Sequence, residues 1–313
     1  MRILGFILSL ALTGCSLEVA DTHFFHPGPS SAKPASFSQP AENVEIDGED
    51  GATLRGVYVR RPDAAVDVLY FGGDSFTIDD FGPEIESRVS SIGANLFMVD
   101  YRGYGRSGGV PTLPLVKADA LAAFDALRAR NEGRPIIVHG FSMGSFVAAY
   151  VASERPVSGL ALESTATTVK DWARAQIPLY AKPFVRLRIA PLLLEASNVQ
   201  ALSRYCGPLL LVTGDRDAIT PPRFARSLFE SSCTPLPRKS VVIAPGKYHG
   251  DAFTSPVAMT AYRDFLWNSR SSSSDTAGPR TCIAVSSITP DFTAGAQRTR
   301  LPESTSGISR PPH

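Results

Sequence analysis

The sequence PIIVHGFSMGSFVAAYV at residues 135–151 decides the fold of this chain. The run at residues 136–138 is apolar and β-branched, which is typical of a strand buried on both faces of a sheet. Small residues such as Ala148 then allow a helix to pack closely against that strand. Between the two stands a Gly-x-Ser-x-Gly pattern at residues 140–144. We therefore expect a strand, a sharp turn that exposes the hydroxyl of Ser142, and a helix.

The same five-residue pattern occurs a second time, around Ser107 at residues 105–109. This copy follows an expected strand, but it leads into Pro111 and Pro114 and so does not open a helix directly. A nucleophilic serine of this kind needs the strand, turn and helix together. The sequence therefore favours Ser142 as the nucleophile and not Ser107.

Apolar segments alternate with segments of helical periodicity through residues 42–270. An opening hairpin is expected from the alternating residues 44–46 and 54–59, with Asp-Gly pairs in the turn between them. Further strands are expected at residues 66–71, 94–100, 136–138, 157–162, 208–213 and 240–243, and helices at 80–92, 115–130, 222–231 and 255–267 as well as after Ser142. This order predicts an α/β fold whose mostly parallel sheet carries helices on both faces.

Two segments interrupt the alternation. Residues 165–204 show no strand pattern and are rich in apolar side chains, which favours a small helical cap over the strand ends. The alternative is one further packing helix with loops. Residues 271–313 begin with a run of serines and lose all periodicity, so a disordered tail is expected there.

The first residues have the pattern of an export signal. An apolar run at residues 3–12 follows a single positive charge and is too short to span a bilayer. Residues 1–14 and Cys15 resemble a bacterial lipoprotein signal with its lipidated cysteine, and Ser16 is the following residue associated with the outer membrane. The sequence thus predicts a protein exported and lipid-anchored in the cell envelope, on the periplasmic face of the outer membrane. An ordinary signal peptide with an incidental cysteine is the alternative.

Residues 15–41 are rich in Ser, Pro and Ala, which predicts a tether between the membrane and the folded domain. The isolated His23 and His26 are expected to be solvated there, because neither has a set of partners that could form a metal site. Nothing else in the sequence implies a metal or an organic cofactor.

The composition excludes one class of partner and allows one covalent link. The chain has 31 basic and 30 acidic residues without a basic face, so nucleic acid is not an expected partner. Cys206 precedes an expected strand and Cys233 ends the helix after it. A helix that returns antiparallel to its strand brings these ends together, and an exported protein can oxidise the pair. A disulfide and two reduced buried thiols both remain open.

The hydroxyl of Ser142 needs a base, and the base needs an acid that orients it. In folds with this type of turn the chain order is serine, acid and histidine. His249, in a glycine-flanked loop after a strand, is the expected base, since only His313 in the tail also follows Ser142. Asp217 is the expected acid, because the Gly-x-x-Asp spacing precedes a proline-capped helix. Asp215 is the alternative and is expected to brace the turn.

Two backbone N–H groups must stabilise the negative charge that develops on the substrate oxygen. Met143 follows the nucleophile and should supply one of them. Asp74 should supply the other, since it lies in the loop after the expected strand at residues 66–71, where Gly72 and Gly73 allow a close approach. A plain glycine-rich turn is the alternative reading of that loop.

Five motifs occur in the expected order, at residues 70–74, 100–107, 140–144, 214–217 and 248–250. With them the chain resembles α/β-hydrolase-fold serine hydrolases of the Bem46/ABHD-like group, over about residues 42–268. The resemblance implies a serine hydrolase that cleaves carboxylic esters or thioesters through an acyl-enzyme, with a small acyl ester as substrate. It also makes the Ser107 motif a structural loop beside the site.

One position departs from the family pattern. Members of the group usually carry His-Gly where this chain has Gly72-Gly73, and the resemblance implies that this histidine commonly braces the oxyanion loop. A peptidase or an acyltransferase of the same fold remains an alternative, as does an idle hydrolase fold that serves as a binding lipoprotein. The membrane, reached through a lipidated Cys15, is the expected partner besides the substrate.

Overall fold

The computed structural model describes residues 15–30 and 33–269. The expected signal peptide at residues 1–14 and the expected tail at 271–313 lie outside the described residues, and only the backbone of Cys15 is described. No helix in the described part of the chain is both long and apolar enough to cross a bilayer.

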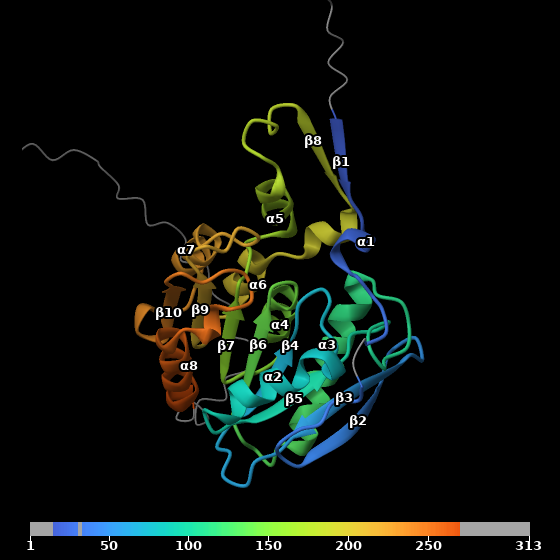
Figure 1. Ribbon diagram of the computed structural model, residues 1–313, viewed down its shortest axis with the longest axis vertical. Helices are drawn as coiled ribbons and strands as arrows, with labels where there is room; N and C mark the ends of the chain where they lie inside the picture. The colour runs from blue at the N-terminus through green and yellow to red at the C-terminus, as the bar shows by residue number, and fades with distance from the viewer. Residues whose placement is uncertain (1–14, 31–32, 270–313) are drawn as a thin grey trace, which may run out of the picture. The chain divides into compact units, whose positions relative to one another are not determined.

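An eight-stranded sheet runs through the fold in the order β10-β9-β7-β6-β4-β5-β3-β2 (Figure 1). The strands from β10 to β5 are parallel, and the hairpin of β2 and β3 joins antiparallel to β5. The sheet strands are β2 (Ala41–Asp47), β3 (Thr53–Val59), β4 (Asp67–Phe71), β5 (Asn95–Val99), β6 (Ile136–Phe141), β7 (Gly159–Glu163), β9 (Leu209–Gly214) and β10 (Lys239–Ala244). The predicted α/β-hydrolase architecture is confirmed.

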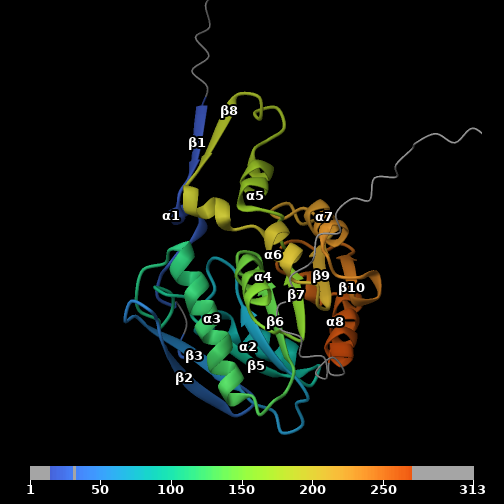
Figure 2. The same cartoon turned by 180° about the vertical axis from the view of Figure 1, so that it is seen from behind.

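Helices cover both faces of this sheet, as Figures 1 and 2 show from opposite sides. One core lies under α3 (Leu113–Arg130), α4 (Gly144–Glu154), α6 (Asn198–Arg204) and α7 (Arg223–Ser231). A second core lies under α2 (Ile78–Ser90) and α8 (Pro256–Ser269). Alternate strand residues serve the two cores, as Leu69 packs into the first and Tyr70 into the second. Because both faces are covered, the central strands are buried throughout.

The cap differs from the helical segment that we expected at residues 165–204. It contains α5 (Val169–Gln176), β8 (Val185–Ile189), a 3₁₀ turn η1 (Pro191–Glu195) and α6. The expectation that this segment has no strand is wrong, because β8 pairs in parallel with β1 (Cys15–Val19). The alternation in β8 of half-buried apolar residues with the exposed Arg186 and Arg188 is the strand signal.

The segment predicted as a tether is ordered against the domain. After β1 comes the short helix α1 (Asp21–Phe24), and both Phe24 and Phe25 are buried in the first core. The prediction that residues 15–41 stand outside the core is therefore corrected. Burying two large aromatic side chains is favourable, and this holds the segment against the domain although the Ser and Pro residues around them favour solvent.

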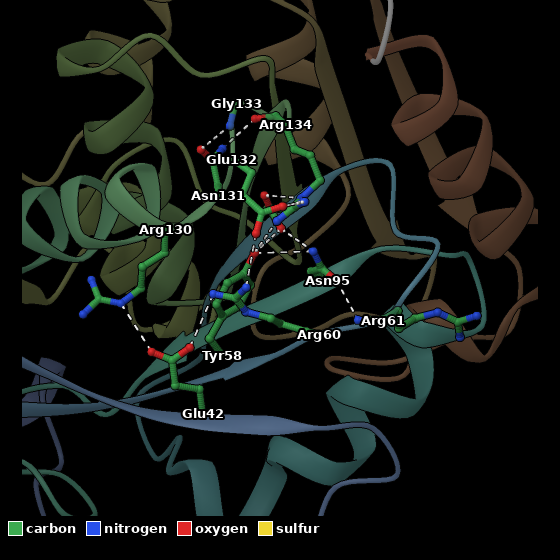
Figure 3. A network of polar contacts seen from close by, with 11 residues as sticks. Glu42, Tyr58, Arg60, Arg61, Asn95, Arg130, Asn131, Glu132, Gly133 and Arg134 are labelled. Carbon is green, nitrogen blue, oxygen red and sulfur yellow. Dashed lines mark hydrogen bonds and ion pairs between the residues drawn. The ribbon is translucent and has the colours of Figure 1, made fainter.

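A buried polar network closes the amino-terminal end of the sheet, away from the ends that carry Ser142. Asp67 begins β4 and accepts hydrogen bonds of 2.7 Å from both the Tyr58 hydroxyl and the Asn95 amide, while Arg134 lies 3.3 Å away. Figure 3 shows Tyr58, Asn95 and Arg134 converging there. Burial, together with the bond to Asp67, raises the pKa of Tyr58 to about 12. These hydrogen bonds and the ion pair compensate the carboxylate of Asp67, which would otherwise be costly to bury.

Replacing Phe25 by Ala tests the corrected role of the N-terminal segment. The side chain is 2% exposed, so its loss should lower the free energy of unfolding by about 3 kcal/mol. Urea titration measures this value. Leu236→Ala is the control, because that side chain is 71% exposed and should change the stability by less than about 0.5 kcal/mol. Equal values for the two variants would mean that Phe25 lies in a free tether after all.

Candidate active site

Ser142 lies in a strained turn between β6 and α4. Its φ is 53°, in the left-handed region that side chains rarely adopt, and its amide donates a 2.9 Å hydrogen bond to the carbonyl of Glu163. A Cβ on Gly140 would lie 2.3 Å from the carbonyl oxygen of Gly144, and one on Gly144 would lie 2.2 Å from that of Phe71. The two glycines are therefore required for this turn, as the motif predicts.

His249 reaches Ser142 from the loop after β10. Its Nε2 lies 3.0 Å from Oγ of Ser142, within hydrogen-bond distance. The ring also packs against Phe141, with 5.2 Å between the ring centres. The adjacent Gly250 has a φ of 87°, which explains the glycine in this loop. The structure thus brings together two residues that are 107 positions apart in the chain.

Asp217 lies on the other side of the imidazole, in the loop after β9. Its Oδ2 and Oδ1 are 3.0 and 3.1 Å from Nδ1 of His249. Burial raises the pKa of this carboxyl, but its hydrogen bonds with His249 and Thr220 outweigh burial and hold the pKa below the usual value. Asp215 is exposed and its amide bonds to the carbonyl of Ala244, so it belongs to the turn. Of the two candidate acids, the structure places Asp217 at the imidazole.

Thr220 is a member of this site that our sequence reasoning missed. Its hydroxyl donates a 2.7 Å hydrogen bond to Oδ2 of Asp217 and lies 3.2 Å from Nδ1 of His249. Its amide donates a second 2.7 Å bond to Oδ1 of Asp217. The carboxylate is therefore held at both oxygens. The signal was available, since Asp-x-x-Thr is a local spacing at which a side chain can bond to the backbone three residues ahead.

Ser142 and His249 face a cavity of about 140 Å³. Its walls are mostly apolar and come from the elbow, the cap, the N-terminal segment and the loops after β4 and β9. The apolar lining residues include Phe24, Met143, Phe146, Ala166, Trp172 and Ile219, and His23, Asp74 and Thr220 are further polar ones. A larger hollow of about 330 Å³, lined by residues such as Phe37 and Arg106, shares no residue with this site. The cavity at Ser142 suits a small, mainly apolar group.

Both residues predicted to supply the oxyanion-binding amides line this cavity with Ser142. Met143 immediately precedes α4, so its amide lies at the amino end of a helix. Asp74 follows β4 in the loop that passes the elbow, and a Cβ on Gly73 would lie 3.6 Å from Cβ of Ser142. Ser107, by contrast, donates to the carbonyl of Asp100 at 2.7 Å and accepts from the amide of Arg55 at 2.8 Å. Ser107 therefore stabilises the loop after β5 through hydrogen bonds and does not line the cavity.

The departure at Gly72 has a structural reason. A Cβ there would lie 2.1 Å from the ring of Phe76, so this chain has no room for a side chain at that position. Its carbonyl accepts a 2.9 Å hydrogen bond from the hydroxyl of Tyr101. From the N-terminal segment, Nδ1 of His26 lies 3.0 Å from Oδ2 of Asp74. These contacts hold the loop from outside it, and the His26 contact was not expected from the sequence.

His23 and His26 are exposed, as expected, but they do not lie in a free tether, because His23 lines the cavity and His26 contacts Asp74. His23 lines the cavity, and its Nδ1 accepts a hydrogen bond from the amide of Ala20 at 3.1 Å. Among the described residues no group of three or more His, Cys, Asp or Glu side chains could hold a metal ion. Of the two states that the sequence left open for Cys206 and Cys233, the structure has the disulfide.

Comparison with known proteins gives one family match and several relatives. The family model described as serine aminopeptidase S33 (Hydrolase_4) matches residues 84–205. The α/β hydrolase domain-containing protein WAV2 of Arabidopsis thaliana is 27% identical over 236 residues, which cover 71% of this chain and 76% of WAV2. Protein bem46 of Schizosaccharomyces pombe is 26% identical over 60% of this chain and 64% of its own length. The lysophosphatidylserine lipase ABHD12 of Mus musculus is 26% identical over 64% of this chain and 56% of its own length.

Among solved structures, the esterase Pf2001 of Pyrococcus furiosus superimposes with a TM-score of 0.62 at 21% identity, over 78% of this chain and 98% of that one. This similarity shows the fold. The similarity to WAV2, bem46 and ABHD12 supports the resemblance of this chain to the Bem46/ABHD-like group of α/β hydrolases.

Gly144→Ala tests whether the close approach of backbones at the elbow is required. The added methyl group would overlap the carbonyl of Phe71, and we expect the variant to fail to fold or to lose at least about 3 kcal/mol of stability. Thermal unfolding followed by circular dichroism measures the change. Gly28→Ala is the matched control, since nothing lies within 4 Å of a Cβ there. A Gly144→Ala protein as stable as the control would contradict the geometry.

The lowered pKa of Asp217 predicts how stability changes with pH. Its ionised form stabilises the fold above the unfolded value of 3.8, and this contribution is lost as the pH falls through the lower folded pKa. We expect the stability difference between the wild type and Asp217→Asn to be constant near neutral pH and to decrease below about pH 4. Urea unfolding of both proteins from pH 7 to pH 3 measures it. A difference that grows in acid would show that burial dominates and that the pKa is raised.

Proposed function

We propose that this chain is a serine hydrolase that cleaves carboxylic esters or thioesters through an acyl-enzyme, and that it is exported and anchored to the envelope by a lipid on Cys15. The observation that carries the catalytic part is the continuous chain of contacts from Asp217 through His249 to Ser142, each of 3.0 Å. Contacts of this length allow a proton to pass between a hydroxyl and an imidazole held by a carboxylate.

In the proposed first half-reaction Oγ of Ser142 attacks the acyl carbon while Nε2 of His249 takes the hydroxyl proton. Asp217 keeps the proton on Nδ1 and stabilises the imidazolium that forms. The amides of Met143 and Asp74 would hold the oxyanion. His249 then returns its proton to the departing alcohol or thiol. In the second half-reaction water gives a proton to His249 and attacks the acyl carbon. The bond between Oγ of Ser142 and the acyl carbon then breaks, and His249 returns the proton to Oγ, which restores the hydroxyl and releases the acid.

The walls of the cavity support an acyl group as the part of the substrate that binds there. Phe24, Phe146 and Trp172 present apolar surface beside Ser142, which favours a hydrocarbon chain over a sugar. The carboxylate of Asp74, at the same cavity, disfavours an anionic group close to the reacting carbonyl. Because ABHD12 is a lysophosphatidylserine lipase by name, single-chain lipid esters belong in the substrate panel.

A peptidase is the second candidate, because the matching family model is described as a serine aminopeptidase. An aminopeptidase needs an acidic group for the substrate's free amine, and Asp74 is a carboxylate that lines the cavity. His26 already contacts that carboxylate, which favours the esterase. Parallel assays with acyl esters of graded chain length and aminoacyl arylamides separate the two candidates.

Ser142→Ala should lower kcat on the best ester of the panel at least about 1,000-fold, because the acyl-enzyme can no longer form. Steady-state kinetics on the folded variant measure the loss. Ser107→Ala is the matched control from the second Gly-x-Ser-x-Gly pattern and should retain kcat within a few fold. An unchanged kcat in Ser142→Ala refutes the assignment. A wild-type protein that hydrolyses no ester or amide and takes no fluorophosphonate label would instead favour a binding lipoprotein.

A further inference from the structure

Exposed apolar side chains gather on the cap and the strand that pairs with it. Of the fourteen large hydrophobic residues that the described part of the chain exposes, seven lie in residues 15–19 and 165–204: Leu17, Leu179, Tyr180, Phe184, Leu192, Leu194 and Val199. The most exposed of all are Leu179 at 82% and Tyr180 at 81%, in the loop between α5 and β8. We call residues 178–188 the cap tip. Within the cap tip, Leu179, Tyr180 and Phe184 are exposed apolar side chains within six residues of one another, and apolar side chains exposed together are typical of an interaction surface.

The cap tip is also basic. Lys182, Arg186 and Arg188 lie within it, and the same residues include no Asp or Glu. None of the three forms a salt bridge with another described residue. In β8 the two arginines are exposed and alternate with half-buried apolar residues. The tip therefore combines apolar side chains with cations that form no ion pair with another described residue, although Glu18 of β1 lies opposite Arg188 in the register of the ribbon.

The described chain begins at this tip. Cys15 pairs with Val185 at the start of the parallel β1–β8 ribbon, next to Phe184. Figures 1 and 2 both show the first residues of β1 beside the loop that leads into β8. The backbone of Cys15 therefore lies beside the residue that follows Phe184. A lipid on Cys15, as proposed above, would therefore hold the cap tip close to a membrane.

We propose that the cap tip docks on the surface of an anionic phospholipid bilayer. Leu179, Tyr180 and Phe184 enter the boundary between headgroups and acyl chains, and the three cations contact lipid phosphates. The docking goes beyond the proposed hydrolase activity and does not require it. A lipid on Cys15 would tether the chain at the same place, while the tip fixes the orientation of the domain on the membrane.

The orientation has a consequence for the active site. Helix α5 ends at Gln176, two residues before the cap tip begins, and Trp172 of the same helix lines the cavity at Ser142. A lipid that leaves the bilayer at the tip would therefore meet α5 on its way to the nucleophile. The cap tip thereby links the membrane surface to the acyl-binding cavity.

Quenching by brominated lipids tests the docking on the full chain. Tyr180→Trp is mixed with vesicles of phosphatidylcholine and phosphatidylglycerol that carry bromine on the acyl chains, and the signal of Trp172 and Trp267 is subtracted with the unsubstituted chain. We expect the added tryptophan to lose about half of its fluorescence or more. Leu236→Trp is the matched control, at an exposed site outside the cap, and should not be quenched. A signal at position 180 that is no more quenched than at position 236, or a chain that does not float with these vesicles, overturns the proposal.

A charge variant tests the contacts with lipid phosphates, and an activity assay separates docking from hydrolysis. Lys182→Gln, Arg186→Gln and Arg188→Gln together should weaken vesicle binding about tenfold or more, and the unsubstituted chain should lose a similar factor on vesicles of phosphatidylcholine alone. Equal binding to both vesicle types overturns the proposed lipid contacts, and a tip covered by a second copy of the chain would give an unquenched position 180.

Hydrolysis of a short, soluble ester is followed in parallel. Activity without quenching overturns the docking alone, whereas quenching without activity refutes the proposed function alone.

Discussion

The left-handed backbone of Ser142 is the constraint on which the site depends. It turns the chain out of β6 and into α4 within a few residues, and the hydroxyl projects from the turn. The turn exists because Gly140 and Gly144 leave room for crossing backbones, and it is held by the bond from Ser142 to the carbonyl of Glu163. Strain of this kind persists only where the surrounding structure fixes it. Here the buried central strands provide that fixed frame.

The parallel sheet explains why distant residues meet at this turn. Strands β6, β9 and β10 run in the same direction, so the loops after them leave the sheet at the same edge. Those loops carry Ser142, Asp217 and His249. The acid is held by two amides and by the hydroxyl of Thr220 before it reaches the imidazole. Two backbone amides and the hydroxyl of Thr220 therefore fix the position of Asp217 relative to His249.

Much of this arrangement could be predicted from the sequence, because it follows from local signals. The elbow motif and the strand–helix alternation are each encoded within a few neighbouring residues. The chain order of Ser142, Asp217 and His249 follows from the type of fold that the elbow motif indicates. The return of a helix along its strand made the Cys206–Cys233 disulfide possible, but it did not decide between a disulfide and two reduced thiols. Ser107 could be set aside because prolines, and not a helix, follow it.

The parts that were missed depend on contacts that are distant in sequence. Composition made residues 15–41 look like a linker, but the Phe24–Phe25 pair finds a core made by α4 and the cap. The alternation in β8 is a short strand signal, but its partner β1 lies in the segment that was taken for a linker, so their pairing could not be predicted. The contact of His26 with Asp74 depends on the same folding back of the N-terminal segment. No pattern within either segment could show these pairings.

The most direct measurement is the site of acylation during turnover. A slow acyl ester is mixed with the enzyme, the reaction is quenched in acid, and peptide masses are compared with and without substrate. The account predicts one acyl group, on the peptide that contains Ser142, and its disappearance as the ester is consumed. An acyl group on another residue, or steady turnover without any acylated peptide, would contradict it.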